Sequence, residues 1–181
     1  EYLDETLGRP ASAGELDFLI GGDQFFPRFI DQAASAQNSI DIRAYIFDND
    51  DVAMEIAQLL KRRSREGVEV RVLFDGLGTI IASGESASTL PEDHRAPLSI
   101  EHYLEQNSAV SVRTVQNTWL AGDHVKTMVI DKQLAYLGGM NIGREYRYDW
   151  HDLMVEIRGP VVDEINDEFN QAWRKASWLG D

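Results

Sequence analysis

Apolar and polar residues alternate with two different periods along residues 16–75, and the change of period predicts a succession of strands and helices. Strands are expected over residues 16–20, 39–47 and 68–74. Helices are expected between them, because apolar residues recur there at helical spacing: Phe25, Phe26, Phe29, Ile30 and Ala33, then Val52, Ile56, Leu59 and Leu60. Asp23 is a candidate N-cap, and Gly67 ends the second helix. This order predicts an α/β layer in which some strands pair in parallel.

The second half of the chain predicts a hairpin set between further helices and strands. Two apolar stretches, residues 125–130 and 134–137, flank a short polar turn at 131–133 and form the hairpin. The other segments are expected as a loop at 79–97, a helix at 98–106, a strand at 110–115, a polar and aromatic loop at 142–149, a strand at 150–157 and a final helix at 161–177. Residues 1–15 are expected to form an N-terminal arm, and residues 16–181 a single domain.

Composition supports a folded domain and narrows its chemistry. The 181 residues are 43% hydrophobic and 27% charged, which is typical of one globular domain with a core. No apolar run approaches the roughly 18 residues of a membrane span, and the absence of cysteine excludes disulfides and cysteine-bound zinc. The net charge of −14 argues against a broad nucleic-acid surface but not against a small basic pocket. Because the chain begins at Glu1 and not at Met, we expect it to be a fragment or a processed chain.

The stretch around the hairpin carries the candidate chemistry. His124 and Lys126 are two residues apart, so on a strand they point to one face with backbones roughly 7 Å apart. An imidazole and an ammonium side by side favour an anion between them, and a phosphate fits both groups. Gly138 and Gly139 permit a close backbone approach, and the Asn141 amide can donate to an oxyanion.

The spacing of these residues resembles a known signature. His124-x-Lys126, four residues, Asp131, six residues and Gly138-Gly139-x-Asn141 resemble the HKD motif of the phospholipase D superfamily. Further resemblance lies in Ser39-Ile40, Tyr45-Ile46-Phe47, Gly67-Val68 and Val72-Leu73-Phe74-Asp75. It extends over residues 16–178 and is closest to the bacterial cardiolipin synthase-like branch. The resemblance implies one phospholipase D-like lobe: an α/β fold with a mixed β-sheet flanked by helices on both faces.

The resemblance also implies a reaction, in which phosphodiesters are cleaved in two steps through a phosphohistidine. His124, Lys126 and Asn141 would act at the phosphate, and Asp152, in a segment that resembles the family's W-x-D, would accept a hydrogen bond from the second nitrogen of His124. Asp131, at the turn, is expected to hold the hairpin through backbone contacts. No cofactor is expected, and no catalytic metal, because Lys126 beside His124 would repel a divalent cation.

The family's reaction needs two HKD motifs, and this sequence contains a single HKD motif. The second HKD lobe would come from a longer two-lobed polypeptide, which we favour, or from a homodimer. The leading function is therefore a phospholipase D or cardiolipin synthase-like lobe acting on a phospholipid or other phosphodiester. The alternatives are a metal-independent endonuclease or phosphodiesterase acting as a homodimer, and a non-catalytic lobe.

Some expectations concern the surroundings of the site. Peripheral membrane contact is expected through residues 79–97 or 142–149, where Arg144, Arg147 and Tyr148 are candidates for a substrate headgroup. His94 and His102 are expected on the surface, and His151 on a strand, pointing away from the site. A cardiolipin synthase-like chain would be cytoplasmic or membrane-associated.

Overall fold

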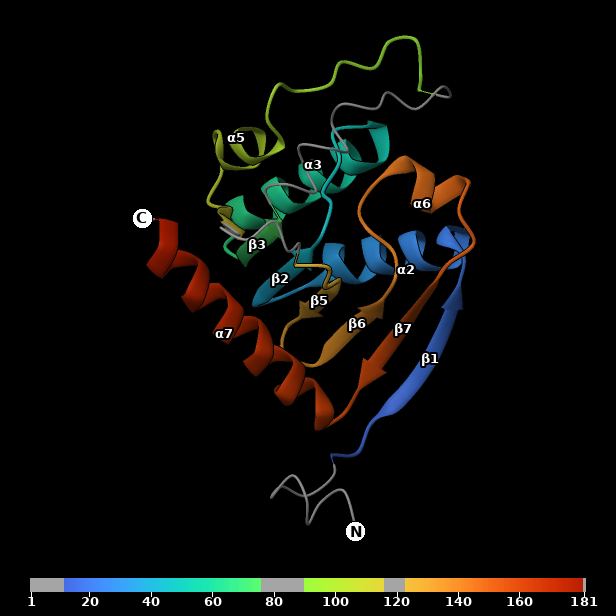
Figure 1. The fold of residues 1–181 in the computed structure, drawn as a ribbon, viewed down its shortest axis with the longest axis vertical. Helices are drawn as coiled ribbons and strands as arrows, with labels where there is room; N and C mark the ends of the chain where they lie inside the picture. The colour runs from blue at the N-terminus through green and yellow to red at the C-terminus, as the bar shows by residue number, and fades with distance from the viewer. Residues whose placement is uncertain (1–11, 76–89, 116–122, 181) are drawn as a thin grey trace.

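The computed structural model describes residues 12–75, 90–115 and 123–180, and it arranges seven strands of these segments in one sheet (Figure 1). The order across the sheet is β1-β7-β6-β5-β2-β3-β4. The strands are β1 (Glu15–Ile20), β2 (Ser39–Ala44), β3 (Glu69–Asp75), β4 (Ser111–Val115), β5 (Thr127–Ile130), β6 (Leu134–Gly138) and β7 (Leu153–Arg158). β2, β3 and β4 pair in parallel, and all other neighbours pair antiparallel, so the sheet is mixed.

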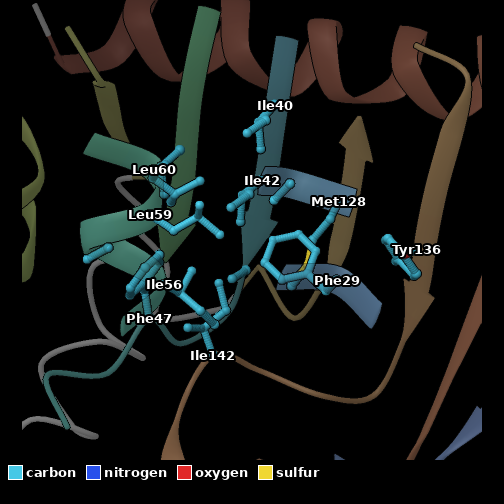
Figure 2. Packing of buried hydrophobic residues seen from close by; sticks show 14 of the residues in the cluster. Phe29, Ile40, Ile42, Phe47, Ile56, Leu59, Leu60, Met128, Tyr136 and Ile142 are labelled. Carbon is cyan, nitrogen blue, oxygen red and sulfur yellow. The ribbon is translucent and has the colours of Figure 1, made fainter. Parts of the chain in front are cut away.

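Helices cover both faces of this sheet, which confirms the predicted fold class (Figure 1). One face carries α2 (Gly22–Ser35), α3 (Asp51–Arg65), α5 (Ile100–Glu105) and α6 (Arg144–Tyr148), and the other carries α7 (Val161–Gly180). The larger core lies under α2 and α3, where Phe29 and Ile56 pack toward Ile42 and Met128 of the central strands (Figure 2). Among the described residues, no helix is both long enough and apolar enough to cross a membrane.

Some predicted boundaries of helices and strands differ from those in the structure. α2 is capped by Gly21, whose φ of 79° favours glycine, and not by Asp23. The strand predicted to run to Phe47 ends at Ala44, and Phe47 makes an isolated bridge to Ile142. Residues 142–149, predicted as a loop, contain the short helix α6. The predicted loop at 79–97 falls largely outside the described residues.

Asp131 lies in the β5–β6 turn with a φ of 53°. Its carboxylate accepts hydrogen bonds from the backbone N–H groups of Gln37, Asn38 and Ser39 at 2.8, 2.6 and 2.9 Å. It therefore binds the connection between α2 and β2, and not its own hairpin as the sequence suggested. Burial raises the pKa of Asp131, but the three hydrogen bonds outweigh burial and hold the pKa below its ordinary value.

Replacing Asp131 by Ala is expected to lower the free energy of unfolding by about 1–3 kcal/mol, because three N–H groups lose a charged acceptor. Since the pKa is lowered in the folded state, the contribution is present at neutral pH and is lost as the pH falls through the folded-state pKa. Urea unfolding at pH 7 and pH 3 measures this. Asp31→Ala, at an exposed position of α2, is the control, and an equal loss in both variants would contradict the prediction.

Candidate active site

The candidate site lies at one end of the sheet, where the parallel strands β2 and β3 end and β5 begins. Ligands of α/β sheets are commonly bound beyond the carboxyl ends of such strands. His124 and Lys126 precede β5, Asn141 follows β6, and Asp152 precedes β7. The β-ladder places these three segments on neighbouring strands, so residues far apart in the sequence come together here.

His124 and Lys126 meet at the ring of Tyr45, the first residue after β2. The His124 and Tyr45 ring centroids are 4.6 Å apart, and Lys126 Nζ lies 5.2 Å from the Tyr45 centroid. Lys126 Nζ also donates a hydrogen bond to the carbonyl of His124 at 3.2 Å. The side chain of His124 is exposed and that of Lys126 is buried, so an exposed imidazole and a buried ammonium lie against the same ring.

The charge of Lys126 is balanced by two carboxylates at some distance. Burial lowers the pKa of Lys126, and the negative charges of Asp152 and Asp123 oppose that effect. Lys126 makes no ion pair within the described part of the chain, and its hydrogen bond goes to a neutral carbonyl.

Asn141 is buried, and both ends of its amide are engaged. Its Oδ1 accepts a hydrogen bond from the N–H of Ile46 at 3.0 Å, and its Nδ2 donates to the Tyr146 hydroxyl at 2.7 Å. Burial raises the pKa of Tyr146. The predicted role of Asn141 as an oxyanion donor thus rests on its second amide hydrogen, or on the Tyr146 hydroxyl beside it.

Gly138 and Gly139 lie close to Asp152 and the start of β7. A Cβ on Gly138 would lie 2.2 Å from the carbonyl oxygen of Leu153, so the backbone excludes a side chain there. A Cβ on Gly139 would lie 2.2 Å from Asp152 Oδ1, so a side chain there would displace the Asp152 carboxylate. Asp152 Oδ1 accepts a hydrogen bond from the N–H of Leu153 at 2.7 Å. Within the described segments, His124 and Asp152 make no hydrogen bond to each other, so the orienting role of Asp152 stays a prediction.

Sequence reasoning missed an anchor beneath the motif. The guanidinium of Arg43, on β2, pairs with both carboxylate oxygens of Asp123 at 2.8 and 2.9 Å. The N–H of Asp123 donates to Asp75 Oδ2, at the end of β3, at 2.9 Å. Asp123 directly precedes His124, so both strands fix the backbone from which the imidazole projects. The sequence could have pointed to this part of the site, because Tyr45 and Asp75 lie near the carboxyl ends of two strands predicted to be parallel, where ligands commonly bind.

The headgroup candidates of α6 serve largely to hold that helix. Arg144 pairs with Asp51 at 2.6 Å and Arg147 with Glu55 at 2.7 Å, both on α3. Both guanidinium groups also stack on Tyr148. Nearby, burial raises the pKa of Asp48 to about 6, with the charges of Asp50 and Glu145 adding to it.

Among the described residues, no other histidine contacts the ring of Tyr45 that His124 and Lys126 share. His94 is partly buried and its Nε2 contacts the carbonyl of Asn49 at 2.9 Å. His102 on α5 and His151 before β7 are exposed. The structure therefore brings together His124, Lys126, Gly138, Gly139, Asn141 and Asp152 at one end of the sheet and leaves Asp131 at the other end of β5.

Comparison with known proteins identifies the family of this domain. The family model for the phospholipase D-like domain of cardiolipin synthase matches residues 29–173. The chain therefore belongs to the phospholipase D-like family.

Three individual relatives share 30% sequence identity or less with this chain. The chain is 26% identical over 170 residues to a cardiolipin synthase of Clostridium perfringens (strain 13 / Type A), covering 90% of this chain and 34% of that protein. It is 30% identical over 181 residues to cardiolipin synthase A of Pseudomonas fluorescens (strain SBW25), covering 92% and 35%. It thus spans about a third of the length of these relatives. The crystal structure of Nuc, a phospholipase D family member from Salmonella typhimurium, superposes with a TM-score of 0.68 at 17% identity, covering 90% of this chain and 95% of Nuc, and this likeness shows the fold alone.

Proposed function

We propose that this domain is a catalytic lobe of a phospholipase D or cardiolipin synthase-like enzyme, which cleaves a phosphodiester and passes the phosphoryl group to water or to an alcohol. The observation that carries the proposal is the exposed imidazole of His124 held beside the buried ammonium of Lys126 at the end of the sheet. Homology to cardiolipin synthases favours a phospholipid as the phosphodiester.

In the proposed first step, a ring nitrogen of His124 attacks phosphorus and the P–O bond to the leaving alcohol breaks. The product is a phosphohistidine, and the leaving oxygen takes a proton from a histidine of a second lobe. In the second step, that histidine removes the proton from water or an acceptor alcohol, whose oxygen attacks phosphorus and releases His124. Lys126 neutralises non-bridging oxygens in both steps, without a metal.

A second phospholipase D-like lobe is the proposed partner, and an apolar sheet face supports it. The large side chains of this face are Leu16, Phe18 and Ile20 of β1, Leu137 of β6 and Leu153 of β7, and their exposed fractions run from 38 to 61%. Strand register joins them, since Ile20 lies opposite Leu153 and Phe18 and Leu137 both lie opposite Val155. Leu137 and Leu153 directly adjoin Gly138 and Asp152, so a lobe docked on this face would reach the site.

A double substitution of the apolar sheet face, Phe18→Asp with Leu153→Asp, is expected to lower activity at least about tenfold, because charge opposes burial of the face. If the second lobe is a second copy, the mass by light scattering should also fall from dimer to monomer. Leu98→Asp, an exposed leucine away from this face, is the control. A double variant with wild-type mass and activity would contradict the docking assignment.

The proposed function is tested by hydrolysis of bis(p-nitrophenyl) phosphate, with and without EDTA, on a sample whose mass is measured by light scattering. Activity that resists EDTA supports metal-independent histidine chemistry. Phosphoryl-enzyme trapped by an alkaline denaturing quench, and then found to be stable in alkali and labile in acid as a phosphoramidate is, would identify the intermediate. Full loss of activity in EDTA that returns with added divalent metal would overturn the mechanism.

A smaller phosphodiesterase acting as a homodimer is the second candidate. It is supported by the match to Nuc, of which this chain covers 95%, so that one lobe can account for nearly a whole chain of this family. A nucleic-acid substrate is opposed by the net charge of −14. Binding to DNA that weakens steeply with salt would favour that substrate over a lipid.

A further inference from the structure

Tyr45 contacts both reactive groups of the site, although it comes from a different strand. Its ring is tilted by 54° against the His124 imidazole, at 4.6 Å between centroids. The same ring lies 5.2 Å from Lys126 Nζ. Since Tyr45 follows β2 and the motif precedes β5, the contact depends on the antiparallel pairing of these two central strands.

We propose that Tyr45 is a positioning residue, whose ring fixes the His124 imidazole and the Lys126 ammonium relative to each other for attack on phosphorus. The inference rests on the proposed function and adds a residue to its machinery. The exposed His124 side chain has its only aromatic contact among the described residues with Tyr45. Without that contact an exposed imidazole would populate several rotamers, and only some would face a phosphate beside Lys126.

The ring also suits the cation. The face of an aromatic ring carries negative potential and attracts an ammonium group within about 6 Å. Lys126 is buried, and its other close partner is the His124 carbonyl, a neutral acceptor at 3.2 Å. A carboxylate in the place of Tyr45 would hold the cation more tightly but would compete with the phosphate for it. A neutral ring holds Lys126 in place and leaves its charge for the substrate.

Two variants separate the ring from the hydroxyl. Tyr45→Phe keeps the ring and should retain kcat within about threefold, whereas Tyr45→Leu should lower kcat by about tenfold or more, with a smaller change in KM. Tyr103→Leu is the matched control, because Tyr103 also lies over a lysine, Lys61, but on α5 away from the site. The free energy of unfolding is measured for both leucine variants. If Tyr103→Leu is destabilised as much as Tyr45→Leu but keeps its kcat, the loss of kcat in Tyr45→Leu does not come from lower stability.

Proton NMR of the full chain gives a readout that does not depend on activity. Protons above an aromatic ring resonate upfield, so the ring protons of His124 and the ε-methylene protons of Lys126 should be upfield in the wild type and in Tyr45→Phe. In Tyr45→Leu the His124 signals should move to the positions of exposed His102, and in Tyr103→Leu they should stay. Assignment uses His124→Asn.

The proposed role of Tyr45 and the proposed function can fail independently. Unchanged His124 signals in a folded Tyr45→Leu variant would overturn the inference, and so would a Tyr45→Phe variant as impaired as Tyr45→Leu. An inactive wild type, in the presence of its second lobe, would overturn the proposed function, while the NMR shifts would still report whether Tyr45 holds the two groups.

Discussion

Replacing His124 by Asn is expected to lower phosphodiester turnover by at least about 10³-fold, because the variant lacks the nucleophile or acid on which both steps depend. The folded state should be almost unaffected. The His124 side chain is exposed, and exposed substitutions change the free energy of unfolding by about 0.5 kcal/mol or less. Hydrolysis of bis(p-nitrophenyl) phosphate and urea unfolding of the same samples measure the two effects.

His102→Asn is the matched control, since His102 is also exposed but lies on α5, outside the site. It should retain wild-type turnover. Comparable activity in His124→Asn and the wild type would remove His124 from the mechanism. Equal losses in both variants would mean that the assay reports a general property of the surface and not the imidazole at the sheet end.

The part of the site that the sequence could predict is the part written in one short stretch. His124, Lys126, Gly138 and Asn141 have fixed spacings at the start of β5 and the end of β6, and a hairpin brings these two ends together whatever the rest of the fold. The strand and helix periods of residues 16–75 likewise depend on local burial, so the α/β class could be predicted from them.

What the sequence could not predict depends on contacts between distant segments. Tyr45 meets His124 because β2 and β5 are neighbours, and Arg43 meets Asp123 for the same reason. The strand order that makes β2 and β5 neighbours cannot be read from the hydrophobic pattern of either strand. Asp131 is a further case, since its turn was predicted but its carboxylate binds the α2–β2 connection.

Glu156 is the clearest case of a long-range requirement. On β7 it takes a position that faces the α2 side of the sheet, where an apolar residue would be expected, and it is 3% exposed. Three partners compensate for its burial. Arg28 of α2 donates from Nε at 2.9 Å, Arg158 donates from Nη2 at 3.1 Å, and the hydroxyl of fully buried Tyr136 donates at 2.9 Å. The compensating residues lie on three elements, so no local pattern shows them.

The second large effect is therefore expected at Glu156. Replacing it by Leu should lower the free energy of unfolding at pH 7 by about 1–3 kcal/mol, because the buried hydroxyl of Tyr136 loses its acceptor. The loss falls mainly on the Tyr136 hydroxyl, because Arg28 and Arg158 are nearly half exposed and can be hydrated. Adding Tyr136→Phe removes that unpaired hydroxyl, so the double variant should recover about 1–2 kcal/mol relative to Glu156→Leu.

The stabilisation by Glu156 should depend on pH. Burial raises the pKa of Glu156, but the hydrogen bonds from Arg28, Tyr136 and Arg158 outweigh burial and leave the pKa below its ordinary value. A carboxylate with a lowered pKa stabilises the fold above its unfolded-state pKa, and this contribution is lost as the pH falls through the folded-state pKa. The difference in the free energy of unfolding between the wild type and Glu156→Leu should hence be largest near neutral pH and shrink in acid.

Glu69→Leu, at a largely exposed carboxylate on β3, is the control and should change the free energy of unfolding by about 0.5 kcal/mol or less at neutral or acid pH. A Glu156→Leu variant as stable as Glu69→Leu at pH 7 would mean that the network is dispensable, and that the α2–sheet packing alone holds this part of the fold.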